Sequence, residues 1–469
     1  MDINFNFLSK KIKGLNKTKT VYTLILLGIF LLTLSQLINK IESLTILFTI
    51  YYLVVISYFI INNKNILCDY NFIFINVFFL YSILSPIHYI LNNFTSIPMS
   101  FEVNYNIIFQ VVKEYFFIFG LFSIYAIIFT SKNYKHNNNT NLIKYFNEVD
   151  LSRDNIFIIY DVIAVICLII FIKPILFDRI SLLNVNKGEY ISLINAKILK
   201  YSYYYFQAYS IYVISNLFNL LSRNKLNKKN MPRYFLICIY WMLNLKIGIR
   251  FEFMVVFLFS IIYIFSINVK IKKKYILYIG CFAIILLFIG VLREINTLSE
   301  IKEKNFMDIF YPMAAEFILP QYISYFYFTF HKTLLLGKSY LIYSLLYLFP
   351  SNILSNKPLP FGVEFMIDSK KVGAALAFNP VAEGMINFGE NFSLVLVCIL
   401  IIISILIYFF KKKDPIFYII CTSSIIAFCR GQFSIWITDI IFLYIILKFI
   451  SLTQKRRKKV EVFNNISNA

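Results

Sequence analysis

The sequence predicts an all-α polytopic membrane protein with about twelve transmembrane helices, and three observations carry this prediction. Of its 469 residues, 59% are hydrophobic and only 15% are charged, whereas a soluble domain carries about 25% charged residues. The hydrophobic residues come in runs of about 20, the length that crosses roughly 30 Å of hydrocarbon. Lys and Arg gather in short blocks between these runs, as they do in cytoplasmic loops.

The apolar runs place the predicted helices in two groups, with a long interval between them. The first group has nine helices, at 21–38, 44–61, 71–91, 106–130, 156–175, 199–221, 234–246, 251–267 and 275–292. The second group has three, at 393–410, 416–429 and 435–450.

The charge of the connecting segments alternates along the chain and predicts the topology. Basic loops follow the fourth, sixth, eighth, tenth and twelfth helices, while residues 92–105 contain no Lys or Arg. By the positive-inside rule this alternation places both termini in the cytoplasm. Five lysines precede the first apolar run without a small-residue cleavage site, so we expect a signal anchor there.

The overall charge and the cysteines exclude several function classes. The formal charge of +22 belongs to the cytoplasmic loops, so no nucleic-acid partner is expected. Most of the seven cysteines lie within apolar runs, and no CxxC pair or Cys/His cluster occurs. We therefore predict no disulfide framework, no metal and no cofactor. Walker A, GxSxG, HExxH and GxGxxG motifs are also absent, which leaves ATP, metalloprotease and dinucleotide chemistry unsupported.

The interval between the two groups of helices divides the chain into three predicted regions. A bundle spans 1–292, an external (periplasmic) loop spans 293–392, and helices with a basic tail span 393–469. The loop contains six of the eleven prolines together with aromatic and aliphatic stretches. Such a segment is expected to lie along the outer membrane surface as short amphipathic or re-entrant helices. Long loops with apolar segments of their own are usually functional.

Three arginines are predicted at external helix ends, against the positive-inside bias. Arg250 follows the seventh helix, Arg293 follows the ninth, and Arg430 lies between the last two. Each one alone could be an interfacial anchor, but together they favour a shared anionic ligand, because Arg holds phosphate through a planar fork of donors. Lys246, at the end of the seventh helix, is a fourth candidate for this ligand.

A carboxylate in the predicted loop is the candidate general base. Glu383 lies in the stretch NPVAEGMINFG, where an apolar turn rich in Gly and Pro could support proton transfer. A solvated loop glutamate is the alternative. His331 is a weaker candidate base, and Lys113 and Glu114, inside the fourth helix, are expected to pair within the bundle.

These stretches resemble the oligosaccharide repeat-unit polymerases of bacterial surface polysaccharides, the O-antigen polymerase or Wzy type. The resemblance rests on the turn at 248–250, Arg293, and three motifs. The motifs are LGKSY at 336–340, LFPSNI at 348–353 and AEGMINFGENF at 382–392. Ile249 stands where the family usually has a small residue before the arginine, so the match is weaker at that turn.

The resemblance implies a reaction on the outer face of the bacterial inner membrane. Undecaprenyl-pyrophosphate-linked oligosaccharides would be the substrates, and a hydroxyl of one repeat unit would attack the anomeric carbon of another chain. Arginines would stabilise the departing diphosphate without a metal, and Glu383 would take the proton. The partners that this implies are membrane lipids, a chain-length regulator and a flippase.

Three other functions stay open on sequence grounds. A lipid-linked oligosaccharide flippase also has about twelve helices, although its loops are usually short. An O-antigen ligase would use the same kind of donor with a different acceptor, and His331 is the loop histidine available for it. A receptor or structural membrane protein would not need the three arginines.

Overall fold

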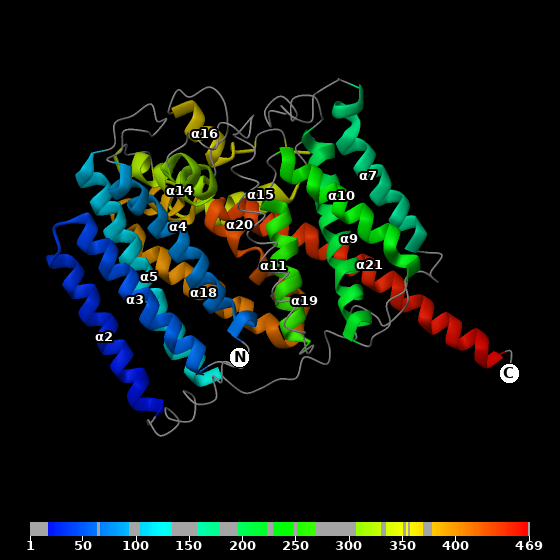
Figure 1. The fold of residues 1–469 in the computed structure, drawn as a ribbon, viewed down its shortest axis with the longest axis horizontal. Helices are drawn as coiled ribbons and strands as arrows, with labels where there is room; N and C mark the ends of the chain where they lie inside the picture. The colour runs from blue at the N-terminus through cyan, green and yellow to red at the C-terminus, as the bar shows by residue number, and fades with distance from the viewer. Residues whose placement is uncertain are drawn as a thin grey trace. The chain divides into compact units, whose positions relative to one another are not determined.

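The structure is a computed structural model, and every regular element that it describes is a helix. The described residues are 17–62, 66–92, 104–133, 157–177, 196–222, 228–247, 251–267, 306–329, 334–349, 353–354, 357–368 and 378–467. Figure 1 traces the chain and labels most of its helices.

Eleven of the twelve predicted segments are helical, and the ninth, 275–292, lies outside the described residues. Ten of them form single helices: α2 Lys17–Leu37, α3 Ile41–Asn62, α4 Tyr70–Asn92, α5 Tyr105–Asn133, α7 Phe157–Phe177, α9 Ala196–Ser222, α10 Met231–Ile247, α11 Phe251–Ser266, α18 Phe392–Lys413 and α21 Phe433–Ser467. Two 3-10 turns, η1 Ile66–Cys68 and η3 Lys228–Asn230, precede α4 and α10.

Six helices of the described chain are long and apolar enough to cross a membrane by length and composition. These candidate spans are Lys19–Leu37, Ile41–Asn62, Tyr70–Leu91, Tyr105–Thr130, Pro380–Lys411 and Phe433–Thr453. The all-helical, polytopic character of the chain is thereby confirmed, while the number of twelve crossings stays a prediction.

The eleventh predicted helix is broken in the middle, into α19 Pro415–Ser423 and α20 Ile425–Arg430. The hydroxyls of Ser423 and Ser424 donate to backbone carbonyls three residues earlier, at 3.0 and 3.1 Å. Such bonds compete with the regular helical ladder. The indole of Trp436 donates to the Ser424 carbonyl at 3.0 Å, so the break leaves that buried acceptor satisfied.

The predicted external loop contains more helix than expected. Four helical stretches occur: α14 Phe306–Thr329, the continuous run of η4 Ser339–Tyr343 and α15 Ser344–Leu348, α16 Phe361–Asp368, and α17 Pro380–Phe388. A 3-10 turn, η5 Gly389–Asn391, leads from α17 into α18. Short helices were expected here, but α14 has 24 residues.

The second half of α14 is buried in the bundle and does not lie on a surface. Its polar side chains pair with α4: Gln321 Nε2 donates to the Ser82 carbonyl at 3.0 Å, and the hydroxyls of Tyr325 and Ser85 are 2.9 Å apart. Because buried polar groups need partners, these pairs explain why an aromatic, proline-containing stretch packs inside. The expectation of a purely interfacial loop is corrected for this segment.

Contacts between Cα atoms divide the chain into two compact units. The first comprises Met1–Asn137, Ala314–Phe409 and Phe428–Ser434, and the second Asn138–Met313, Phe410–Ala427 and Ile435–Ala469. In the first unit α2, α3, α4 and α5 pack side by side (Figure 1). Gly120 allows α2 and α5 to approach closely, because a Cβ there would lie 2.5 Å from Leu32.

Asp161, inside the predicted helix 156–175, has a specific charged partner. In the second unit Arg233 of α10 forms a forked pair with Asp161 of α7, with nitrogen to oxygen distances of 2.7–3.0 Å. Tyr209 also donates to Asp161, at 2.8 Å. Because the forked pair is only partly buried and joins α10 to α7, we assign it a structural role.

Lys113 and Glu114 have separate partners, contrary to the expectation that they pair. Lys113 Nζ lies 3.5 Å from the Gln36 carbonyl, and the Glu114 carboxylate accepts from the Ser393 hydroxyl. The physical reason is that consecutive residues of a helix point in different directions.

Candidate functional site

Glu383 lies in a short helix, α17, whose residues Pro380 to Asn387 are all buried. Asn379 caps this helix: its side chain accepts from the Ala382 N–H at 2.9 Å, and Pro380 follows at the first helical position. Asn before Pro is a common helix start, because the side chain replaces a missing carbonyl and Pro needs no N–H partner. The cap therefore fixes Glu383 in the first turn of the helix.

The Glu383 carboxylate joins three segments of the first unit. It is fully buried. One oxygen, Oε1, accepts from the Ser339 hydroxyl at 2.5 Å, and the other, Oε2, accepts from the Phe433 backbone N–H at 2.8 Å. Phe433 is the first residue of α21, and the positive end of a helix dipole stabilises an anion. The carboxylate thus connects α17, the start of η4 and the start of α21.

The chain before Ser339 covers the C-terminal end of α17. The backbone N–H groups of Leu335 and Leu336 donate to the carbonyls of Ile386 and Asn387, at 3.1 and 3.0 Å. These bonds satisfy carbonyls that the end of a helix leaves without partners. Leu336 has a φ of +50°, which is rare for a residue with a side chain, so this turn carries strain of the kind found at functional sites.

Asn387 orients the Ser339 hydroxyl. Its Nδ2 donates to Ser339 Oγ and to the Glu383 carbonyl, both at 2.8 Å. Because Ser339 Oγ accepts from this amide, its own hydrogen is directed to Glu383. Asn387, Ser339 and Glu383 therefore form a chain of hydrogen bonds with a defined direction.

Aromatic rings enclose this chain of hydrogen bonds. Tyr340 stacks on Phe388 with ring centroids 5.9 Å apart and lies 5.3 Å from the ring of Phe433. Burial, and then the charge of Glu383, raises the pKa of Tyr340 well above its usual value, so its phenol stays neutral. Its hydroxyl has no hydrogen-bond partner among the described residues.

Arg430 lies next to this cluster in the chain, in the turn that joins α20 to α21. The turn is fixed at two points: Gln432 Oε1 accepts from the Phe361 N–H at 3.0 Å, and Phe433 donates to Glu383 at 2.8 Å. Arg430 itself is partly exposed at the end of α20. The structure thus places Glu383 and Arg430 in one unit, on segments that are hydrogen-bonded to each other.

The other predicted site residues are not placed by the structure. Arg250, Arg293 and His331 lie outside the described residues, and Lys246 lies in α10 without a described side chain. The convergence of the three arginines therefore stays a prediction. In the described ranges no group of three or more His, Cys, Asp and Glu could hold a metal ion.

Sequence reasoning did not identify Ser339 and Asn387. Both are neutral, and Ser339 lies 44 residues before Glu383 in the chain. The only sequence feature that pointed to them is that Ser339 lies in LGKSY and Asn387 in AEGMINFG, two of the motifs that resemble the family.

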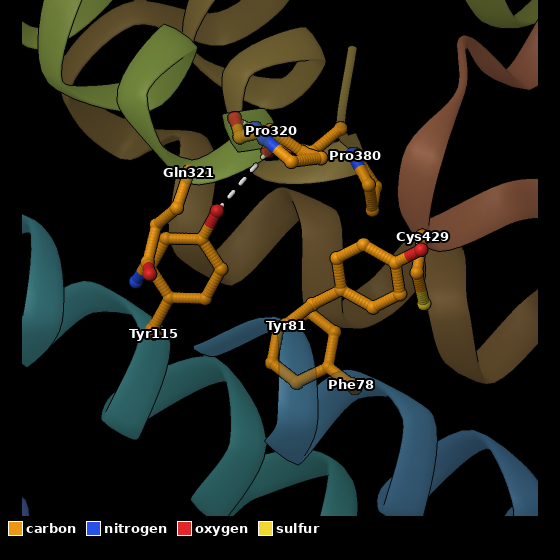
Figure 2. Close-up of a pocket in the computed structure, with 8 residues that line it drawn as sticks. Phe78, Tyr81, Tyr115, Pro320, Gln321, Pro380 and Cys429 are labelled. Carbon is orange, nitrogen blue, oxygen red and sulfur yellow. Dashed lines mark hydrogen bonds between the residues drawn. The ribbon is translucent and has the colours of Figure 1, made fainter. Parts of the chain in front are cut away.

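A small cavity lies beside the N-terminus of α17. Its volume is about 10 Å³, close to the room needed for one water molecule. It is lined by Phe78, Tyr81, Tyr115, Pro320, Gln321, Asn379, Pro380 and Cys429. A dashed line in Figure 2 marks the hydrogen bond that the Tyr115 hydroxyl makes. That hydroxyl donates to Asn379 Oδ1 at 3.2 Å, so the residue that caps α17 is itself held by α5.

Comparison with known protein families shows which family the chain matches. The model of the family described as O-antigen polysaccharide polymerase Wzy matches residues 20–458. No curated protein and no solved structure matches the chain.

Proposed function

From the premise that the chain belongs to the Wzy family of O-antigen polysaccharide polymerases, we propose that it joins lipid-linked oligosaccharide repeat units into a surface polysaccharide. The observation that carries the proposal is the buried Glu383 carboxylate, hydrogen-bonded to the turn that presents Arg430. A base and a cation on linked segments are the two groups that transfer of a glycosyl group from a diphosphate needs.

The proposed donor is a growing glycan on undecaprenyl pyrophosphate, and the acceptor is one repeat unit on the same lipid. An acceptor hydroxyl attacks the anomeric carbon of the donor. A carbon–oxygen bond to the acceptor forms, the bond from the anomeric carbon to the diphosphate breaks, and the diphosphate leaves with both electrons of that bond. The acceptor proton goes to a base.

Each site residue has a proposed role in this reaction. Glu383 is the base, with His331 as the reserve candidate. Arg430, together with Arg250, Arg293 and Lys246, binds the diphosphate of the leaving group. Guanidinium groups suit this role because they stay charged and offer paired donors to phosphate oxygens. In this proposal the arginines supply the charge that a metal would otherwise supply.

The proposed location is the bacterial inner membrane, with both termini in the cytoplasm and the site at the outer face. A flippase that delivers repeat units and a regulator of chain length are the proposed partners. The exposed apolar side chains of the candidate spans, such as Leu26 and Phe30, would contact membrane lipids.

The product that accumulates in a deletion strain tests the proposal. We expect single lipid-linked repeat units outside the inner membrane, and a return of long chains when the intact gene is restored. Repeat units trapped on the cytoplasmic side would instead indicate a flippase. Long lipid-linked chains that are not attached to their final acceptor would indicate a ligase, and either result would overturn the polymerase assignment.

A further inference from the structure

We propose that Ser339 carries the acceptor proton to Glu383 and that Asn387 positions Ser339 for this transfer. The inference rests on the proposed role of Glu383 as the base. It assigns Ser339 as a further catalytic residue of the reaction and Asn387 as a positioning residue.

The Glu383 carboxylate has no face open to a substrate. Glu383 is fully buried within α17, whose residues Pro380 to Asn387 are all buried, and each of its carboxylate oxygens accepts one hydrogen bond. Ser339 is fully buried as well, but it directly follows the exposed Lys338. Oε2 accepts from the backbone N–H of Phe433, and this group cannot pass on a proton because it has no lone pair to accept one. Oε1 accepts from a hydroxyl, which can both donate and accept. Ser339 is therefore the group through which a proton can reach Glu383.

The Ser339 hydroxyl has one acceptor position left for a substrate. A hydroxyl has one hydrogen to donate and two lone pairs that accept. Its hydrogen goes to Glu383 Oε1 at 2.5 Å, and one lone pair accepts from Asn387 Nδ2 at 2.8 Å. The second lone pair can accept the hydrogen bond of a sugar hydroxyl. Asn387 fixes this arrangement because it also bonds the Glu383 carbonyl at 2.8 Å.

Ser339 is the first buried residue after an exposed turn, which gives an acceptor a short route to it. Leu336 has 76% of its surface exposed, and Lys338 is exposed as well. Gly337 has a φ of +81°, a conformation that glycine adopts at no steric cost. The turn therefore brings the chain from the surface to Ser339 within two residues.

The proton balance of the step is simple. As the acceptor oxygen bonds to the anomeric carbon, its proton moves to Ser339 Oγ, and the Ser339 proton moves to Glu383. Serine ends as a neutral hydroxyl, Glu383 ends as a carboxylic acid, and the diphosphate leaves with the negative charge. The titratable described groups that face Glu383 are the phenols of Tyr340 and Tyr347, and burial raises the pKa of both above the usual value.

The test uses purified full-length protein in liposomes with a lipid-linked repeat unit, and measures the turnover rate against pH. We expect Ser339→Ala to lower the maximal rate about 10²-fold, the low end for loss of acid–base catalysis, with KM unchanged. The rate of the native protein should fall at low pH, because Glu383 becomes protonated. The rate of Ser339→Ala should not fall in this way, because protonation of Glu383 no longer limits it. Ser339→Thr, which keeps a hydroxyl, should restore the rate to within about tenfold of the native protein and restore the decline at low pH.

Three further variants separate a catalytic role from a structural one. Ser339→Ala combined with Glu383→Gln should be no slower than Glu383→Gln alone, because groups that act as a unit are not additive. Asn387→Leu should lower the maximal rate and leave KM unchanged. Ser344→Ala is the matched control, because Ser344 lies on the same run of helix and its hydroxyl bonds only backbone carbonyls among the described residues.

Two results would overturn the proposal, and they are distinguishable. If Glu383→Gln is inactive while Ser339→Ala keeps the native rate and pH profile, the Ser339 path is wrong and the assignment of the base stands. If Glu383→Gln itself is active, the base assignment falls together with the path through Ser339. Where Ser339→Ala fails to accumulate, Ser339→Cys is used instead, because its thiol is a much weaker hydrogen-bond donor and acceptor than a hydroxyl. A native rate and pH profile in Ser339→Cys would overturn the path through Ser339.

Discussion

Replacing Glu383 by glutamine is expected to lower polymerisation by about 10²- to 10⁴-fold, the range for loss of a general base. Glutamine has nearly the same volume, and its carbonyl oxygen can still accept from Phe433, which donates at 2.8 Å in the native protein. Its amide cannot take up a proton at neutral pH. The variant should therefore remain folded in the membrane while the glycan ladder collapses to single repeat units, as seen on a gel of the surface polysaccharide.

Glu390→Gln is the matched control for this experiment. Glu390 lies seven residues further along, in η5, and is exposed. The same chemical change there should leave the ladder unaltered. A normal ladder in Glu383→Gln, at native protein level, would remove Glu383 from the chemistry and leave it a purely structural contact.

Arg430→Ala is the second change with a large expected effect. We expect it to lower the turnover rate by about 10²- to 10³-fold, the range for removing a group that stabilises developing negative charge. The turn around Arg430 should survive, because Gln432 and Phe433 hold it through their own hydrogen bonds. The loss should appear in the turnover rate of purified protein, because the charge on the diphosphate grows as the bond breaks.

Lysine at the same position separates charge from geometry. Arg430→Lys keeps the charge but loses the paired donors, so we expect an intermediate rate, about tenfold above that of Arg430→Ala. Lys40→Ala is the control: Lys40 is exposed between α2 and α3, on the side predicted to be external. If Arg430→Ala and Lys40→Ala behave alike, Arg430 does not bind the leaving group.

The helices could be predicted from the sequence because their signal is local. Runs of apolar residues define α3 and α4, and the structure moves their ends by only one to three residues from the predicted 44–61 and 71–91. The break at Ser424 was missed because no proline or glycine marks it, and the group that satisfies the Ser424 carbonyl, the Trp436 indole, lies twelve residues away. The sequence predicted short helices on the membrane surface for 293–392, and it missed the length and burial of α14, because these depend on contacts with α4.

The candidate site could be predicted only in part, because a sequence shows which residues are charged but not which residues lie close together in the fold. Glu383 and Arg430 were identified since a charged side chain near a membrane needs a reason. Ser339 and Asn387 carry no charge, and their relation to Glu383 arises only when the turn at Leu336 covers the end of α17. The environment of Glu383 also differs from the expected solvated or turn position, since α17 is buried.

The most direct measurement is the reaction of the purified protein in liposomes with a single lipid-linked repeat unit as the only substrate, without nucleotide and without another protein. We expect a ladder of lipid-linked chains that lengthens with time, and no ladder with Glu383→Gln or Arg430→Ala. A native protein that makes no chains under these conditions, or a ladder that both variants leave intact, would contradict it.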